Sequence, residues 1–365
     1  MAIATEHDSN ACWFGPGRKR PGWSLAGLAR LTEGAAVADM NEMLDRCRHL
    51  LALPDDYVLM AKTAGETGAF ESVLWSMLGP QPVDVFAWDV VGRGWMETVT
   101  RQLQVPETRC FMAADGGLPD LTRSFAHHDI VLTWCAPGAG VRVPDASWVL
   151  RDRAGLVLCD ASAAAFTQPL PWRQFDAVAL GLFSGLGAAP GLGLVALSPQ
   201  AMDRLAQYQP TWPIPAVLAL EASDLGTAWS LSDIDFADGL DALIWAESVG
   251  GAAALMERTR ANTQAVLDGL ESCPVLAPVP EREEWLSPGR LCLKPAGPAQ
   301  SLTRDEKKAW RACLLDVLAA SGVAYGVAPL PGSDAVLQLC LGPVVETETA
   351  LRLGQNLTRA AMEME

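Results

Sequence analysis

A glycine turn, a tryptophan and two carboxylates stand where they could hold a small ligand. Gly65, Glu66 and Thr67 form a turn between an expected strand and an expected helix, and the backbone N–H groups of such a turn bind phosphate. Trp95 lies just inside the next expected helix, and Asp160 ends an apolar strand. A buried carboxylate requires a partner, because its unpaired charge is costly. The structural alternatives are a common helix turn, a core tryptophan and a helix cap.

The elements that must position these residues alternate between strand and helix. Apolar runs such as residues 56–64 and 83–90 predict buried strands, and helical patterns follow them. This order predicts an α/β protein with a mainly parallel sheet covered on both faces. We expect an N-terminal arm over residues 1–24, a large domain over 25–255 and a smaller α+β domain over 256–365.

Composition excludes several classes of protein. The chain has 365 residues and a formal net charge of −16, which disfavours binding to nucleic acid or to anionic membrane surfaces. No apolar run reaches the roughly 18 to 20 residues of a membrane helix, and the N-terminus lacks the pattern of a secretion signal. The nine cysteines include no C-x-x-C pair and there are only four histidines. We therefore expect a cytoplasmic protein without a metal site.

The stretch "GLGAAPGLG", residues 185–193, superficially resembles a dinucleotide-binding loop. Its spacing is G-x-G-x-x-x-G, and no suitably placed acidic residue follows, so the motif is weak. We interpret these glycines as a tight turn between two strands.

Stretches along nearly the whole chain resemble the phosphoserine aminotransferase family, a class V branch of the fold-type-I enzymes that use pyridoxal phosphate. They include "KRPGWSL", "TGAFESVLW", "AWDVVGRGW", "GLVLCDASAAAFTQ", "YQPTWPIP" and "DGLDALIWAESVGG". The resemblance implies the fold-type-I architecture, a homodimer and a phosphoserine:2-oxoglutarate transaminase of serine biosynthesis. The family's phosphate turn matches Gly65, Glu66, Thr67 and Gly68. Its ring-stacking tryptophan matches Trp95, and the aspartate that keeps the ring nitrogen protonated matches Asp160.

The family's Schiff-base lysine has no counterpart in this chain. Its glutamine and lysine align with Phe183 and Ser184, and the segment from Asp176 onward needs no gap. A hydroxyl cannot form an imine with an aldehyde. Of the five lysines, Lys62 is the one to consider as a displaced Schiff base, and we interpret it instead as a solvated charge at a strand end.

Other positions that the family uses are also replaced. Its Asn-Gly-Thr turn aligns with residues 135–137, its Asn-Thr pair from the partner subunit with Trp229 and Ser230, and its His-Arg pair is missing from residues 29–36. The arginine that clamps the substrate carboxylate aligns with Gln338, whose amide cannot replace a bidentate guanidinium. Two arginines of the small domain, Arg290 and Arg304, are candidates for that role.

Three hypotheses follow. The favoured one is a pseudoenzyme kept for binding, assembly or regulation, as a homodimer or paired with an active paralogue, with pyridoxal phosphate bound weakly, noncovalently or not at all. The second is a working transaminase, either through Lys62 or as a lysine-free enzyme that holds pyridoxamine phosphate noncovalently. The third is a new activity that uses Cys135, Cys159 or Glu66, although an inert buried thiol is the simpler interpretation of Cys135.

Overall fold

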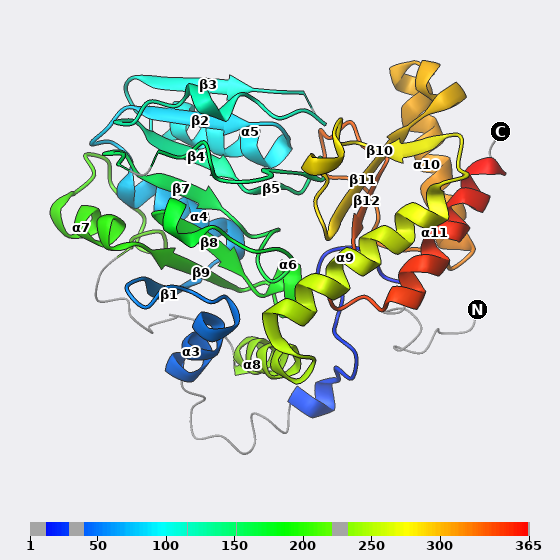
Figure 1. The fold of residues 1–365 in the computed structure, drawn as a ribbon, viewed down its shortest axis with the longest axis horizontal. Coiled ribbons are helices and arrows are strands. Elements are labelled where there is room, and N and C mark those ends of the chain that lie inside the picture. The colour runs from blue at the N-terminus through cyan, green and yellow to red at the C-terminus, as the bar shows by residue number, and fades with distance from the viewer. Residues whose placement is uncertain (1–11, 29–39, 115, 151, 221–232, 364–365) are drawn as a thin grey trace.

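The computed structural model describes residues 12–28, 40–114, 116–150, 152–220 and 233–363 (Figure 1). A seven-stranded sheet forms its centre, in the order β1-β9-β8-β7-β4-β2-β3. The strands are β1 (Val58–Thr63), β2 (Val83–Ala87), β3 (Thr108–Met112), β4 (Asp129–Thr133), β7 (Val157–Asp160), β8 (Ala177–Gly181) and β9 (Leu192–Leu197). Neighbouring strands from β8 to β3 are parallel, whereas β9 is antiparallel to both β1 and β8.

Two layers of helices cover this sheet, as its buried strands require. One face packs against α4 (Gly65–Met77), α5 (Val90–Glu97) and α7 (Pro199–Gln207). The other face packs against α3 (Met40–Leu50) and α8 (Asp233–Ser248). Strand residues alternate between the two cores: Ile130 and Leu132 belong to one, and Val131 to the other. The predicted α/β class with a large, mainly parallel sheet is confirmed.

The C-terminal part forms a second sheet with its own core. Strands β10 (Leu276–Pro278), β11 (Arg290–Pro295) and β12 (Leu337–Cys340) are antiparallel in that order. Helices α9 (Gly251–Leu270), α10 (Arg304–Ala320) and α11 (Thr347–Met362) supply much of the apolar cluster that covers them (Figure 1). The expected division at residue 255 falls inside α9, so the domain boundaries stay a prediction.

Short elements connect these layers. They are the two-stranded ribbon β5 (Cys135–Ala136) and β6 (Val141–Arg142), the single turn α6 (Phe183–Leu186), a π-helical turn (Thr98–Gln102) and 3-10 turns at Leu121–Arg123, Trp172–Gln174, Glu283–Trp285 and Gly297–Ser301. The glycine-rich stretch, residues 185–193, starts in α6 and ends in the first residues of β9, and it connects β8 to β9, which pair antiparallel. Its interpretation as a turn between two strands is confirmed.

The described part of the N-terminal arm is bound to the rest of the fold by charged groups. Arg20 is buried and donates to Asp238 (2.7 Å) and to Asp241 (2.6 Å) on α8. Lys19 donates to Asp238 (2.7 Å) and to the carbonyl of Gly187 (3.0 Å). The arm therefore reaches both α8 and the glycine-rich loop between β8 and β9.

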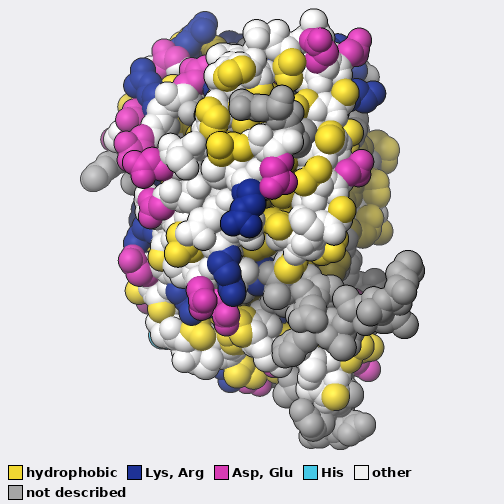
Figure 2. Space-filling model, turned by 90° about the vertical axis from the view of Figure 1, so that its right-hand side faces the viewer, with side chains coloured by type: hydrophobic (Ala, Val, Ile, Leu, Met, Phe, Trp, Pro, Cys, Tyr) yellow, Lys and Arg dark blue, Asp and Glu magenta, His cyan; other side chains and the backbone are white. Residues whose placement is uncertain are grey.

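On the side of the molecule that carries the C-terminal elements, acidic, basic and hydrophobic side chains are interspersed (Figure 2). Within the described ranges, no helix combines the length and apolar character needed to cross a membrane. The same residues contain no cluster of three or more His, Cys, Asp or Glu side chains suited to a metal ion.

Candidate functional site

The candidate site lies where the carboxyl ends of β4 and β7 meet the first turn of α4. Asp160 is the last residue of β7 and Thr133 the last of β4, and the two are register partners. Residues two positions earlier on each strand, Leu158 and Val131, belong to the core that contains α4. Because side chains two positions apart share a face of a sheet, Asp160 and Thr133 both point to the α4 side.

Asp160 has two protein donors. Its Oδ2 accepts from the indole Nε1 of Trp95 at 2.9 Å, and its Oδ1 accepts from the backbone N–H of Ser162 at 3.0 Å. Burial raises the pKa of the carboxyl, and the bonds from Ser162 and Trp95 act in the opposite direction. Trp95 meets Phe70 of α4 edge-on, with ring centroids 5.0 Å apart. Asp160 therefore caps the turn after β7 and also accepts a hydrogen bond from Trp95, the tryptophan that the sequence analysis grouped with it.

Glu66 and Ser184 form the second half of the site. Glu66 Oε2 accepts from the Ser184 hydroxyl at 2.6 Å, and Oε1 accepts from the Ser184 backbone N–H at 3.0 Å. Burial raises the pKa of Glu66, and the bonds from Ser184 and the charge of Arg290 partly offset this. A side chain at Gly181 would place its Cβ 2.4 Å from Glu66 Cγ. Glycine at that position therefore lets the carboxylate reach Ser184.

The turn that begins α4 has the strained backbone of a tight loop. Ala64 and Gly65 have φ values of 78° and 69°. The N–H of Gly65 donates to the carbonyl of Gly191 at 3.1 Å, and a Cβ on Gly65 would lie 2.4 Å from the carbonyl oxygen of Pro190. Thr67 is exposed. The helix N-terminus is present, as the sequence predicted, but one of its amides already binds the neighbouring loop.

Lys62 is not a solvated charge, and that interpretation of the sequence is wrong. The side chain is only 8% exposed, and its Nζ donates to the carbonyl of Ala219 at 2.6 Å. The segment around residue 219 packs over α4, where Leu220 N–H donates to Ser76 Oγ at 3.1 Å. The amine is buried because a segment more than 150 residues away covers it.

The candidate thiols are buried and poorly suited to act as nucleophiles. Cys135 Sγ lies 3.0 Å from Ser287 Oγ, and burial raises its pKa to about 11, although the Ser287 bond lowers it. Burial also raises the pKa of Cys159 well above its ordinary value. A thiol that stays protonated is a weak nucleophile, which supports the simpler interpretation of Cys135.

The two candidate arginines differ in position. Arg290 is buried in β11 and donates to Cys340 Sγ, and its charge acts on Glu66 and Cys135. Arg304 begins α10 and is exposed. Gln338 is buried, and its Oε1 accepts from the backbone N–H of Leu330 at 3.2 Å. The predicted contacts at residues 29–36, Trp229 and Ser230 lie outside the described residues.

One polar group in the site escaped the sequence analysis. Thr133 is 3% exposed, and its hydroxyl has no hydrogen-bond partner among the residues that the structure describes. Thr133 could be identified only from its position next to Asp160 at the end of the neighbouring strand, and that position follows from the strand register, which the sequence does not show.

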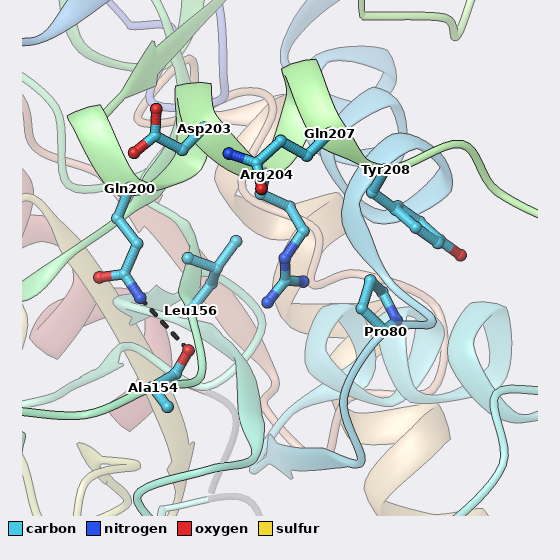
Figure 3. Close-up of a pocket in the computed structure, with 8 residues that line it drawn as sticks. All are labelled: Pro80, Ala154, Leu156, Gln200, Asp203, Arg204, Gln207 and Tyr208. Atoms are coloured by element: carbon cyan, nitrogen blue, oxygen red, sulfur yellow. Dashed lines mark hydrogen bonds between the residues drawn. The ribbon is translucent and has the colours of Figure 1, made fainter.

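A separate hollow of about 350 Å³ lies at the opposite end of the sheet, lined by Pro80, Ala154, Leu156, Gln200, Asp203, Arg204, Gln207 and Tyr208 (Figure 3). Arg204 there donates to Asp129, the first residue of β4, at 3.0 Å. Since Thr133 ends that strand, this hollow does not belong to the site at Asp160.

The pyridoxal phosphate that the resemblance implies fits these residues in part. Asp160 is a suitable partner for a protonated ring nitrogen, and Trp95 lies beside it. Ser184, which the sequence aligns with the family's lysine, carries a hydroxyl bound to Glu66, and a hydroxyl cannot form an imine with an aldehyde. Glu66 places a carboxylate in the first turn of α4, where the phosphate would bind. Asp160 and Trp95 fit the ring end of the cofactor and Ser184 does not fit its aldehyde end, while the match of Gly65, Glu66 and Thr67 to the phosphate turn stays a prediction.

Comparison with known proteins supports the resemblance. No family model matches the chain. It is 32% identical over 362 residues to curated phosphoserine aminotransferases of Methanosarcina barkeri and Methanosarcina mazei, with 94% of this chain and 95% of each relative covered.

Solved structures share the fold at low sequence identity. The phosphoserine aminotransferase of Bacillus circulans subsp. alkalophilus has a TM-score of 0.77 at 15% identity, with 97% of this chain and 99% of that one covered. A pyridoxamine-pyruvate aminotransferase of Mesorhizobium loti also has 0.77 at 15% identity, with 96% and 92% covered. The phosphoserine aminotransferase of Trichomonas vaginalis, solved with pyridoxal phosphate bound, has 0.75 at 13%, with 95% and 99% covered.

Proposed function

The chain belongs to the phosphoserine aminotransferase family, and we propose that it is a member without Schiff-base chemistry, a pseudoenzyme kept for binding, assembly or regulation. The observation that carries the proposal is Ser184. It stands at the position of the lysine, and its hydroxyl and N–H both bind Glu66. A serine held in this way offers no amine to an aldehyde, so transamination through a covalent cofactor has no starting point there.

The retained half of the site supports noncovalent binding. When bound, pyridoxal phosphate supplies an electron sink whose strength depends on protonation of the ring nitrogen. Asp160 would hold that proton at its carboxylate, and Trp95 would keep the carboxylate in place through the bond from Nε1. Without a lysine to form an imine, noncovalent contacts alone would hold the cofactor, so we propose that it binds weakly.

The second candidate is an active phosphoserine:2-oxoglutarate aminotransferase. Family membership and the intact Asp160–Trp95 pair favour it. It requires either that Lys62 leaves the carbonyl of Ala219 to act as the amine, or that pyridoxamine phosphate works without a lysine. The first route costs a buried hydrogen bond to a charged group, about 1.5–3 kcal/mol.

A transaminase assay tests the proposal. The purified full chain is mixed with pyridoxal phosphate, O-phosphoserine and 2-oxoglutarate, and glutamate is measured over time. We expect no glutamate above a heat-denatured control. Sustained production would contradict the pseudoenzyme. Production that disappears in Lys62→Ala would identify a displaced lysine, whereas production that survives Lys62→Ala and disappears in Asp160→Ala would identify a lysine-free enzyme.

We further propose a homodimer, or a heterodimer with an active paralogue, in the cytoplasm. The family resemblance supports a dimer, and the free thiol state of all nine cysteines suits a reducing compartment. Light scattering of the purified chain at micromolar concentration is expected to give twice the chain mass. A mass equal to that of one chain would contradict the homodimer. The heterodimer would then be tested by co-purification with the active paralogue.

A further inference from the structure

We propose that the first half of α10 is a docking surface for an acidic segment of a partner protein. This surface lies in the C-terminal part of the fold, and it does not depend on the proposed function, because a pseudoenzyme and an active transaminase would carry it equally. Three features of α10 support the proposal: a one-sided charge pattern, cations without partners and an electrostatic cost to the helix.

Four basic side chains share one face of α10. They are spaced i, i+3, i+4 and i+7, and at about 3.6 residues per turn this spacing places them within an arc of about 100° and over a length of about 10 Å. We call this set the basic face, and its members are Arg304, Lys307, Lys308 and Arg311. The acidic residues of the helix lie outside this arc: Asp305, Glu306 and Asp316.

The first half of α10 is not covered by the rest of the described fold. The structure buries only Leu314 and Leu318 of this helix, and both lie in its second half. Two members of the basic face are exposed and two are half-buried. Since α10 stands at the edge of the C-terminal part (Figure 1), the basic face is open to a partner.

The basic face lacks a charge partner in the part of the chain that the structure describes. None of its side chains makes an ion pair, a hydrogen bond or a ring contact there, whereas every other described Lys or Arg except Arg359 makes at least one such contact. Glu306 follows next to Lys307 along the helix, but it accepts from the N–H and the hydroxyl of Thr303, each at 2.7 Å, in a capping box. In a chain with 43 acidic and 27 basic residues, four neighbouring cations without a partner require an explanation.

The basic face also destabilises the helix that carries it. Arg304 and Lys308 are like charges four residues apart, as are Lys307 and Arg311, and such pairs repel on a helix surface. Arg304 stands in the first turn, where the helix dipole favours carboxylates over cations. Helix stability therefore does not explain these residues, and sequences break local rules mainly at functional sites.

A short acidic protein segment suits this face. Its length of about 10 Å corresponds to two turns of a partner helix, which present three or four carboxylates. Charges are screened beyond about 8 Å at physiological salt, so a short segment responds to the basic face more than to the net charge of −16. A nucleic acid or a membrane would extend past the face onto the acidic residues of α10, whose charge repels it.

A synthetic peptide tests the sign and the spacing of the charges. The probe is a labelled, alanine-rich helical peptide with four glutamates spaced i, i+3, i+4 and i+7, and the reference peptide has glutamines at those positions. Fluorescence anisotropy measures their binding to the full chain at pH 7. At low ionic strength we expect the glutamate peptide to bind about tenfold more tightly, because four weak ion pairs together give roughly this factor. Added salt should reduce the difference.

Equal binding of the two peptides would overturn the proposal. Tighter binding to an oligothymidylate of the same charge, or to vesicles that contain phosphatidylserine, would also overturn it, because the partner would then be a nucleic acid or a membrane.

Two matched double variants locate the binding. Lys307→Gln with Lys308→Gln removes two charges of the basic face and should weaken binding of the glutamate peptide about threefold to fivefold. Arg101→Gln with Arg173→Gln removes the same charge from exposed arginines outside α10 and should leave the affinity unchanged. Equal weakening by the two double variants would overturn the proposal.

Urea unfolding separates docking from a structural role. Because the basic face repels itself, Lys307→Gln with Lys308→Gln should keep or raise the urea concentration at the unfolding midpoint. A lower midpoint would show that the face stabilises the fold and would overturn the proposal. A different mass of the double variant and wild type in light scattering would assign the face to a second copy of the chain, with the same consequence. None of these measurements involves the cofactor, so their failure leaves the proposed function standing.

Discussion

Replacement of Ser184 by alanine should destabilise the protein in a pH-dependent way. The change removes the 2.6 Å bond from the hydroxyl to Glu66 Oε2 and keeps the backbone bond. A hydrogen bond to a charged group contributes about 1.5–3 kcal/mol and one between neutral groups about 0.5–1.5 kcal/mol. We therefore expect Ser184→Ala to cost about 2 kcal/mol where Glu66 is ionised and about 1 kcal/mol where it is protonated, so the cost should grow as the pH rises.

The sign follows from the pKa of Glu66, which burial raises above its ordinary value of 4.5. In the window just above 4.5 the folded protein binds more protons than the unfolded chain, so stability falls as pH rises through that window. Loss of the hydroxyl donor raises the folded pKa further and extends this fall in stability to higher pH.

Urea unfolding of both proteins at pH 5 and pH 8 measures the effect, with the same pair in a Glu66→Gln background as the control. In that background Ser184→Ala should cost the same at both pH values. A loss that is independent of pH in the presence of Glu66 would refute the reasoning.

Three further changes test other contacts. Arg20→Met removes a buried partner of Asp238 and should lower the free energy of unfolding in urea by about 3 kcal/mol. Arg101→Met, in the exposed pair with Glu97, should lower it by under about 1 kcal/mol. Equal losses would contradict a stabilising role of the buried Arg20–Asp238 pair. Although burial raises the pKa of Asp84, bonds from Arg109, the Phe125 backbone and His128 outweigh it and lower the pKa. Arg109→Ala should therefore destabilise by about 1–2 kcal/mol at pH 7, and the loss should shrink only as the pH falls below the ordinary value of 3.8, since stability from a lowered carboxyl pKa is lost in that range. The same loss at pH 7 and well below pH 3.8 would be contrary evidence. Gly181→Ala places a Cβ 2.4 Å from Glu66 Cγ and should lower the free energy of unfolding in urea by about 1–3 kcal/mol, as overpacking does. A urea unfolding curve like that of wild type would contradict the tight contact between Gly181 and Glu66.

The fold could be predicted because its signals are local. Buried runs such as residues 130–132 and 177–182 are apolar throughout, and the long helical pattern breaks near Gly250 and Gly251, where the structure ends α8 and begins α9. These patterns depend on neighbours along the chain, so composition and period were enough. The position of Asp160 at a strand end was read in the same way, and its bond to Trp95 agrees with the sequence grouping.

The rest of the site depends on pairings between distant segments. The bond between Glu66 and Ser184 spans 118 residues, and the pairing of Thr133 with Asp160 depends on a strand register that no local pattern encodes. The burial of Lys62 has the same cause, since the carbonyl that its amine binds belongs to Ala219, far along the chain. Local sequence patterns predict where a strand ends, but they do not predict which distant segment packs against that end.

The central claim is that no side chain of this protein captures the aldehyde of pyridoxal phosphate. Intact-mass spectrometry after incubation with the cofactor and reduction by borohydride tests it directly, with Ser184→Lys as the positive control. We expect an unchanged mass for wild type and a stoichiometric pyridoxyl-phosphate adduct for Ser184→Lys. A stoichiometric adduct on wild type, mapped by peptide sequencing to any single lysine, would contradict it.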